Sequence, residues 1–264
     1  MLVPQDVVTT AGIVRSFTGG ANPEAGSPIV LLVHGSGGDA TVWEPMLVHF
    51  SRVRAYAIDL PGRGASPSEC LPSAKAYAGF LDQVRAGLGA ERIFVVGQSL
   101  GGGIAQQYAF DFAPRCSGIV LANSALDFNI SAQRLAAIGQ DWEATAAAYA
   151  RGQVSLRATP ELFAAALRMV QARNPEVFRQ DLVVCNGFDA KPWAHRITAP
   201  VLIVAGQDDT LTEPARSLAI YERIAHARMV TLAPCGHCTM LEQPALFAAA
   251  IEAFVAGTAA QASA

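Results

Sequence analysis

Short, almost uninterrupted apolar segments recur along the chain, and they constrain its fold more than any other feature. The clearest are rich in valine and isoleucine and occupy residues 29–33, 93–96, 119–122 and 201–205; weaker examples are 53–58 and 229–232. Segments of this length and composition predict strands that are buried on both faces, as in a parallel sheet. The sequence therefore predicts an α/β fold around a mostly parallel sheet.

Helical patterns separate these predicted strands. The clearest begins with Ser73 as N-cap and places Tyr77, Leu81, Val84 and Leu88 at helical spacing. Alternating strands and helices imply right-handed crossovers and a doubly wound sheet, whose ligands bind at the carboxyl ends of the strands. Residues 7–17 are expected to add an antiparallel hairpin at the N-terminal side.

The alternation stops between about residues 127 and 195, where helical patterns follow one another and no strand pattern is present. One of them begins Thr159-Pro160-Glu161, an N-cap followed by proline at the first helical position. We predict a helical cap at 127–195, inserted into a core made of 1–126 and 196–264. Such an insertion typically serves as a lid or binding element, the alternative being a purely structural excursion. Three large aromatic residues of the insertion either line a pocket or fill its own core, and for at least two of them we expect the core: Trp142, Phe163 and Trp193.

Composition excludes several other classes of protein. A chain of 264 residues can bury one large core, and a net charge of −3 leaves no basic surface for nucleic acid. The longest uncharged stretch, 93–110, carries polar residues that are costly in a membrane, and no signal or transit peptide is visible. Five unevenly spaced cysteines do not suggest a disulfide framework. We therefore expect a single-domain cytoplasmic protein, with its small, polar tail at 257–264 disordered.

The segment Gly97-Gln98-Ser99-Leu100-Gly101 has the pattern G-x-S-x-G and lies directly between a predicted strand and a predicted helix at 100–113. A serine nucleophile raised above a sheet needs such a strained turn with small neighbours, and the helix N-terminus offers N–H groups to a developing oxyanion. The alternative is a glycine-rich turn that merely packs. The strand and helix on either side favour the nucleophile.

Three further segments resemble motifs of the α/β-hydrolase superfamily and follow its chain order. Residues 31–38, LLVHGSGG, are similar to the oxyanion-hole loop; 57–66, AIDLPGRGAS, to the D-x-P-G-x-G-x-S segment; and 236–244, GHCTMLEQP, to the catalytic-histidine loop. Together with the serine motif they cover nearly the whole chain except the insertion. The chain thus resembles a serine hydrolase with the α/β-hydrolase fold.

The resemblance also implies roles for individual residues. Ser99 would be the nucleophile and His237 the base, since a weak hydroxyl nucleophile needs an adjacent imidazole and His237 follows both a candidate acid and the last strand. The family's G-x-x-D spacing from Gly206 selects Asp209, rather than Asp208, as the acid that orients the imidazole. Asp209 could instead be a loop acid that caps the following helix.

Other polar residues near these motifs are assigned by the same resemblance. The backbone N–H groups of Leu100 and Ser36 would form the oxyanion hole, although Ser36 could also be an ordinary loop residue. His34 and Asp59 are expected to be structural. The alternative family position for the acid is occupied by Asn123, which cannot carry the negative charge.

The tetrapeptide Cys235-Gly236-His237-Cys238 is also the active-site sequence of disulfide isomerases. Thiol–disulfide sites place it at a helix N-terminus after an early strand, whereas here it follows the last predicted strand. We therefore expect a coincidence and no redox function. A zinc site is disfavoured because no second ligand pair stands at metal spacing.

The sequence favours a carboxylic ester as substrate. The haloalkane dehalogenases and epoxide hydrolases of the superfamily have aspartate at the position of Ser99, so the chain does not resemble either class. Gln98 and Cys238 depart from the carbon–carbon bond hydrolases of meta-cleavage pathways, which remain an alternative together with enol-lactonases. A hypothesis of another class is a ligand-binding protein without turnover. We expect a small-molecule acyl substrate and no cofactor or metal, while the oligomeric state is left open.

Overall fold

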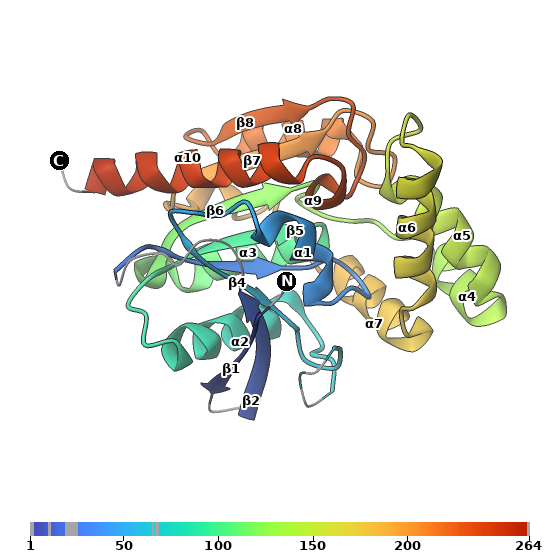
Figure 1. Cartoon of the computed structure of the whole chain (residues 1–264), viewed down its shortest axis with the longest axis horizontal. Coiled ribbons are helices and arrows are strands. Elements are labelled where there is room, and N and C mark those ends of the chain that lie inside the picture. The colour runs from blue at the N-terminus through green and yellow to red at the C-terminus, as the bar shows by residue number, and fades with distance from the viewer. Residues whose placement is uncertain (1–2, 10–11, 19–25, 65, 67–68, 263–264) are drawn as a thin grey trace.

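The computed structural model describes residues 3–9, 12–18, 26–64, 66 and 69–262. Within them, eight strands form one sheet in the order β1-β2-β4-β3-β5-β6-β7-β8 (Figure 1). The six strands β3 to β8 are parallel to one another. Strands β1 and β2 form an antiparallel hairpin, and β2 pairs antiparallel with β4. The strands are β1 (Val3–Thr9), β2 (Gly12–Thr18), β3 (Ile29–Val33), β4 (Arg54–Ile58), β5 (Ile93–Gln98), β6 (Cys116–Ala122), β7 (Val201–Gly206) and β8 (Arg228–Leu232). The predicted α/β fold with a mostly parallel sheet is confirmed, and so is the hairpin, of which residues 10–11 lie outside the described part.

Successive residues of the central strands are buried on opposite faces of the sheet, which explains why these strands read as unbroken apolar runs. In β3, Leu31 and Val33 belong to the core on one face, while Val30 and Leu32 belong to the core on the other. The helices α2 (Ala74–Gly87), α3 (Leu100–Asp111) and α8 (Pro214–Arg223) cover the first face, and α1 (Glu44–Leu47) and α10 (Pro244–Ala262) cover the second. The sheet is therefore doubly wound.

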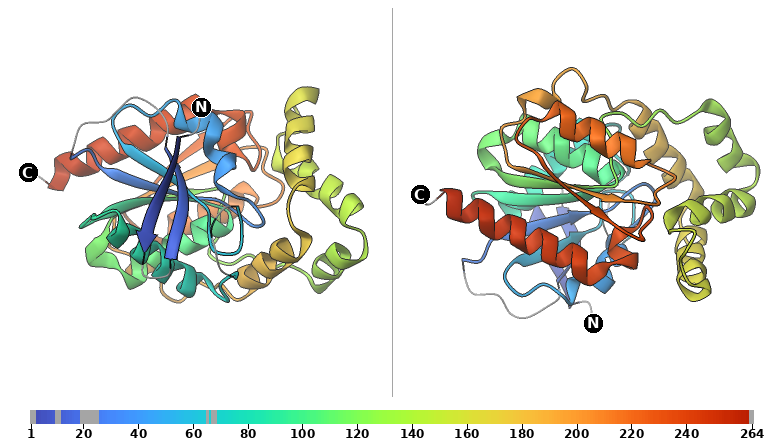
Figure 2. Two further views of the ribbon diagram at one scale, coloured as in Figure 1. Left: turned by 60° about the horizontal axis from the view of Figure 1, so that its bottom comes forward. Right: turned by 90° about the horizontal axis from the view of Figure 1, so that it is seen from above.

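Four helices follow one another between β6 and β7 and lie at one end of the sheet, seen at the right of all three ribbon views (Figures 1 and 2). They are α4 (Ala132–Gln140), α5 (Trp142–Gln153), α6 (Pro160–Gln171) and α7 (Pro175–Asn186). Thr159 caps α6 through its side chain, with Pro160 at the first helical position, as its sequence predicts. That 127–195 forms a cap distinct from the core stays a prediction.

The three large aromatic residues of the insertion are all partly buried in packed clusters. Trp142 lies 5.6 Å from the ring of Phe178, and Phe163 joins the small apolar cluster between α5 and α6. Trp193 packs on Phe110 of α3, with ring centroids 4.7 Å apart. The expectation of core packing for at least two of them is thus confirmed, and Trp193 packs both on Phe110 of the sheet domain and, at 6.1 Å, on Phe188 of the insertion.

The tail differs from expectation. Residues 257–262 were expected to be disordered from their small and polar composition, but they continue α10, which ends at Ala262. Phe247, Ile251 and Val255 of this helix are buried, and the alanine-rich end has high helix propensity. In the part of the chain that the structure describes, no helix is both long and apolar enough to cross a membrane.

Candidate active site

Ser99 occupies a sharp turn between β5 and α3. Its backbone has φ 54° and ψ −118°, an unfavourable conformation for a residue with a side chain. A Cβ atom on Gly97 would collide with the carbonyl oxygen of Gly101, and one on Gly101 would collide with the carbonyl oxygen of Val33. The turn is held by bonds from Ser99 N–H to the Ala122 carbonyl, 3.0 Å, and from Gly102 N–H to the Ser99 carbonyl, 2.9 Å. Close packing of backbone on backbone thus explains why glycine flanks the serine on both sides.

His237 and Asp209 form a buried pair beyond the ends of β8 and β7. The Nδ1 atom of His237 lies 2.9 Å from Oδ2 of Asp209, and the two residues are only 1% and 3% exposed. The other carboxylate oxygen, Oδ1, accepts the N–H groups of Leu211 and Thr212 at 2.8 and 2.9 Å. Asp209 therefore organises its own loop and contacts the imidazole at the same time.

The neighbouring carboxylate, Asp208, points elsewhere. Its Oδ2 atom accepts the hydroxyl of Ser155 at 2.6 Å and lies 3.8 Å from Nε of Arg157. Both partners belong to the segment that follows α5. Of the two aspartates that β7 delivers into this loop, it is Asp209 that contacts His237.

Three residues make contacts around this pair that were not predicted from the sequence. Asn123, which follows β6, donates its amide to Oδ2 of Asp209 at 2.8 Å and to the Gly236 carbonyl at 3.1 Å. Gln98 donates its amide to the His237 carbonyl at 3.2 Å. The hydroxyl of Thr212 lies 3.3 Å from Nδ1 of His237. Each follows or ends a strand at the carboxyl edge of the sheet, and that position was the only signal available.

The loop after β3 brings Ser36 beside the serine turn. Ser36 is 4% exposed, and its N–H, like that of Leu100, has no acceptor among the residues that the structure describes. Ser36 and Ser99 line one small cavity of about 30 Å³ together with Thr212. Two N–H groups without acceptors beside a serine hydroxyl suit the binding of an oxyanion.

His34 and Asp59 hold loops, as expected. Nε2 of His34 accepts the N–H of Leu60 at 3.3 Å, and its Nδ1 atom faces the Gly35 carbonyl at 2.9 Å. Burial, together with the charge of Arg63, lowers the pKa of His34 to about 3, so the imidazole stays neutral. Asp59 accepts the N–H of Ala40 at 2.8 Å.

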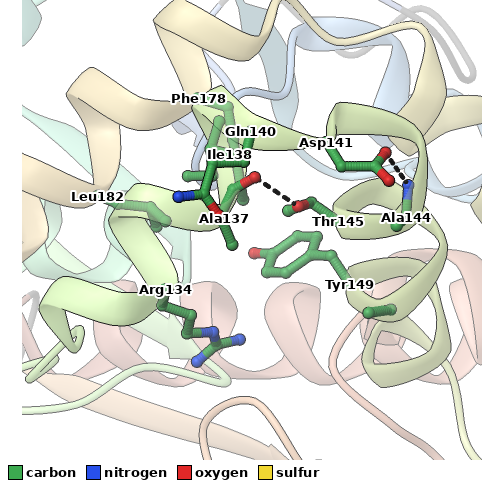
Figure 3. A pocket seen from close by; sticks show the side chains of 11 residues that line it. Arg134, Ala137, Ile138, Gln140, Asp141, Ala144, Thr145, Tyr149, Phe178 and Leu182 are labelled. Atoms are coloured by element: carbon green, nitrogen blue, oxygen red, sulfur yellow. Dashed lines mark hydrogen bonds between the residues drawn. The ribbon is translucent and has the colours of Figure 1, made fainter.

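A larger cavity of about 390 Å³ lies among α4, α5 and α7, and small or apolar side chains such as Ala137, Ala144 and Ile138 line much of it (Figure 3). Arg134, Tyr149 and Leu182 line both this cavity and the small one at Ser99. The two cavities therefore share a wall, and the inserted helices enclose the space next to the serine turn.

The cysteines beside His237 are buried and are not joined to each other. Burial raises the pKa of the Cys238 thiol to about 12, and it also raises that of Cys235. The Cys238 thiol donates to Oε1 of Gln153 at 2.8 Å. These neutral thiols lie on a loop of an eight-stranded, mostly parallel sheet, so the disulfide-isomerase alternative is not supported.

Strand order, the strained serine turn and the pair of His237 and Asp209 together are typical of the α/β hydrolases. The sequence matches the Alpha/beta hydrolase family over residues 30–250, so the chain belongs to that family. This confirms the resemblance and the fold class that its motifs predicted.

Individual relatives carry hydrolase names. A protein of Escherichia coli O1:K1 / APEC, named "Putative carbamate hydrolase RutD", is 26% identical over 244 residues, covering 85% of this chain and 90% of its own length. A hydrolase structure from Pseudomonas aeruginosa PA01 is 28% identical with a TM-score of 0.82, covering 96% of this chain and 98% of its own. The structure of a thermophilic esterase is 25% identical with a TM-score of 0.85, and the coverages are 98% and 99%.

Proposed function

We propose that the protein is a serine hydrolase that cleaves a small-molecule carboxylic ester through an acyl-enzyme on Ser99. The observation that carries the proposal is the buried 2.9 Å contact of His237 with Asp209 beside the strained turn of Ser99. The thermophilic esterase among the similar structures supports an ester as substrate. We expect the reaction to take place in the cytoplasm and to need no metal, cofactor or nucleic acid.

In the proposed mechanism, the hydroxyl oxygen of Ser99 attacks the acyl carbon while Nε2 of His237 takes its proton. The oxyanion accepts the N–H groups of Leu100 and Ser36. Nδ1–H of His237 donates to Asp209, which fixes the tautomer and stabilises the imidazolium. His237 then protonates the leaving alcohol, and the acyl-enzyme forms. In the second half, His237 takes a proton from water while the water oxygen attacks the acyl carbon. The bond between this carbon and the Ser99 oxygen then breaks, His237 returns its proton to Ser99, and the carboxylic acid leaves.

A carbamate is the second candidate substrate, and the name of the Escherichia coli relative favours it. A carbamate also presents an acyl carbon to a serine nucleophile, so the same residues would act on it. Lactones, vinylogous diketones and ligand binding without turnover are the further alternatives that the test separates.

The test is labelling by a fluorophosphonate probe, combined with turnover of p-nitrophenyl esters. Wild type should be labelled and active, and folded Ser99→Ala should be neither. Ser51→Ala is the matched control, because Ser51 is exposed and its hydroxyl and N–H donate to Glu252 on helix α10. Turnover by Ser99→Ala would contradict the proposal, as would absence of labelling in wild type. A panel of ester, carbamate, lactone and vinylogous diketone then ranks the substrates.

A further inference from the structure

We propose that Arg173 and Asp181, both from the inserted helical segment, are positioning residues for the oxyanion hole. The proposal rests on the proposed function. Nη1 of Arg173 donates to the Ser36 carbonyl at 3.1 Å, and the N–H of Gly37 donates to Oδ2 of Asp181 at 2.6 Å. The carbonyl and this N–H belong to the same peptide unit and point in opposite directions. The two charged side chains therefore hold one peptide plane from both edges.

Both side chains are themselves held in place. Asp181 is fully buried, and its other oxygen, Oδ1, accepts Nη2 of Arg63 at 2.8 Å, so its charge is paired inside the protein. The guanidinium of Arg173 lies 5.5 Å from the ring centroid of Tyr149 and 5.9 Å from that of Phe178. Contacts of a cation with ring faces at these distances favour one position of the guanidinium.

The loop also touches α7 directly. The Ser36 hydroxyl lies 3.6 Å from the thiol of Cys185, and a Cβ atom on Gly37, whose φ is +66°, would lie 2.8 Å from the ring of Phe178. Helix α7 thus packs against the loop with little free space. Position and orientation of this loop depend on the inserted helices as well as on β3.

The held peptide unit adjoins the proposed oxyanion donor. Ser36 N–H is separated from the 36–37 peptide by the φ and ψ angles of Ser36 alone, so fixing this plane restricts the direction in which the N–H points. In other hydrolases, loss of a single oxyanion donor lowers kcat by about 10²–10³-fold. Misdirecting the donor should cost less than removing it, and we expect Arg173→Met to lower kcat by roughly 10- to 100-fold.

The experiment compares an ester with its thionoester, in which sulfur replaces the carbonyl oxygen. Arg173→Met should lower kcat while KM changes little, and it should reduce the preference for the oxygen ester, because an intact oxyanion hole favours oxygen. Arg173→Lys keeps a cationic donor and should restore part of kcat and part of the preference for the oxygen ester. Asp181→Asn, which leaves Arg63 without its charge partner, should have the same effect as Arg173→Met if it folds. Arg179→Met is the matched control, since Arg179 lies on α7, the helix that carries Asp181, and pairs with the exposed Glu176.

Each result decides the proposal. An unchanged kcat in folded Arg173→Met would overturn the proposal. So would a loss of activity that leaves the preference for the oxygen ester intact and that Arg173→Lys does not reduce. Ser99→Ala is measured in parallel. An inactive Ser99→Ala with a fully active Arg173→Met removes this proposal alone, whereas an active Ser99→Ala removes the proposed function.

Discussion

Asn123 and Asp209 meet at a single carboxylate oxygen: the Asn123 amide donates to Oδ2 of Asp209 at 2.8 Å, and Nδ1 of His237 lies 2.9 Å from that same oxygen. The two residues follow β6 and β7, which are neighbouring parallel strands. Parallel strands end at the same edge of a sheet, so residues 86 positions apart reach one site. Asn123 is neutral, and its amide holds the carboxylate of Asp209 in place.

The first prediction separates the two adjacent aspartates. Asp209→Asn should lower kcat by about 10⁴-fold, the effect of the equivalent change in the well-studied serine proteases, because the imidazole loses its orienting acceptor. Asp208→Asn should cost little, since Asp208 bonds Ser155 instead. Both folded variants are assayed on one p-nitrophenyl ester. The reverse order of the two effects would contradict the assignment of Asp209.

The second prediction uses the contact between Asn123 and Asp209. Exchanging the two side-chain types, in the double variant Asn123→Asp with Asp209→Asn, returns one carboxylate to the same buried site. It should recover at least about tenfold of the kcat lost in Asp209→Asn, because the new carboxylate can stabilise the imidazolium from the end of β6. The control is Asn123→Asp alone, which places two carboxylates together and should lower kcat. A double variant no faster than Asp209→Asn would rule out this exchange.

The sequence located the ends of strands well, and with them the candidate site. Ser99, Asp209 and His237 each stand a few residues beyond a predicted strand, and parallel strands bring such positions together without any knowledge of the packing between them. The contact of Asn123 with Asp209 was not predicted, because the sequence shows only that an asparagine carries no charge. The contact arises from the side-by-side positions of β6 and β7, which spacing along the chain does not give.

The inserted helices were predicted as helices, but their contacts were not. Arg173 and Asp181 lie more than 130 residues from Ser36 along the chain, and their pairing with the loop depends on how α7 packs against it. Periodicity specifies which face of a helix is apolar and leaves its docking angle open. The end of the chain also differs from the prediction, because burial of Phe247 and Ile251 anchors α10 and the alanine-rich residues after them continue the helix.

The third prediction concerns the buried imidazole of His34. Its pKa is lowered to about 3 in the folded protein, mainly by burial, whereas an exposed histidine titrates near 6.5. The unfolded chain therefore binds a proton first as the pH falls. This contribution to stability is complete above pH 6.5 and is lost progressively between 6.5 and 3, so His34 alone should cost about 2 kcal/mol between pH 7 and pH 5.

Two measurements check this pH dependence. Urea unfolding at the two pH values should give a smaller pH dependence for His34→Asn than for wild type. The ring protons of His34 in wild type should keep their NMR shifts from pH 7 to pH 5, which needs no variant. Titration of the His34 ring near pH 6.5 would contradict the prediction.

The last prediction tests the cavity of about 390 Å³ among α4, α5 and α7 as the place for the part of the substrate remote from the reacting carbonyl. Tyr149 and Leu182 line both this cavity and the one at Ser99, and we predict that a long apolar chain attached to the ester passes between them. Ala144 lines the larger cavity, and Ala144→Phe would fill part of it. Excluding two or more methylene groups, at about 0.8 kcal/mol each, should lower kcat/KM for long-chain p-nitrophenyl esters by at least about tenfold while short esters are spared. Ala147→Phe adds the same ring to the exposed side of α5 and serves as the control. A chain-length profile of Ala144→Phe that follows the wild-type profile would show that substrates do not use this cavity.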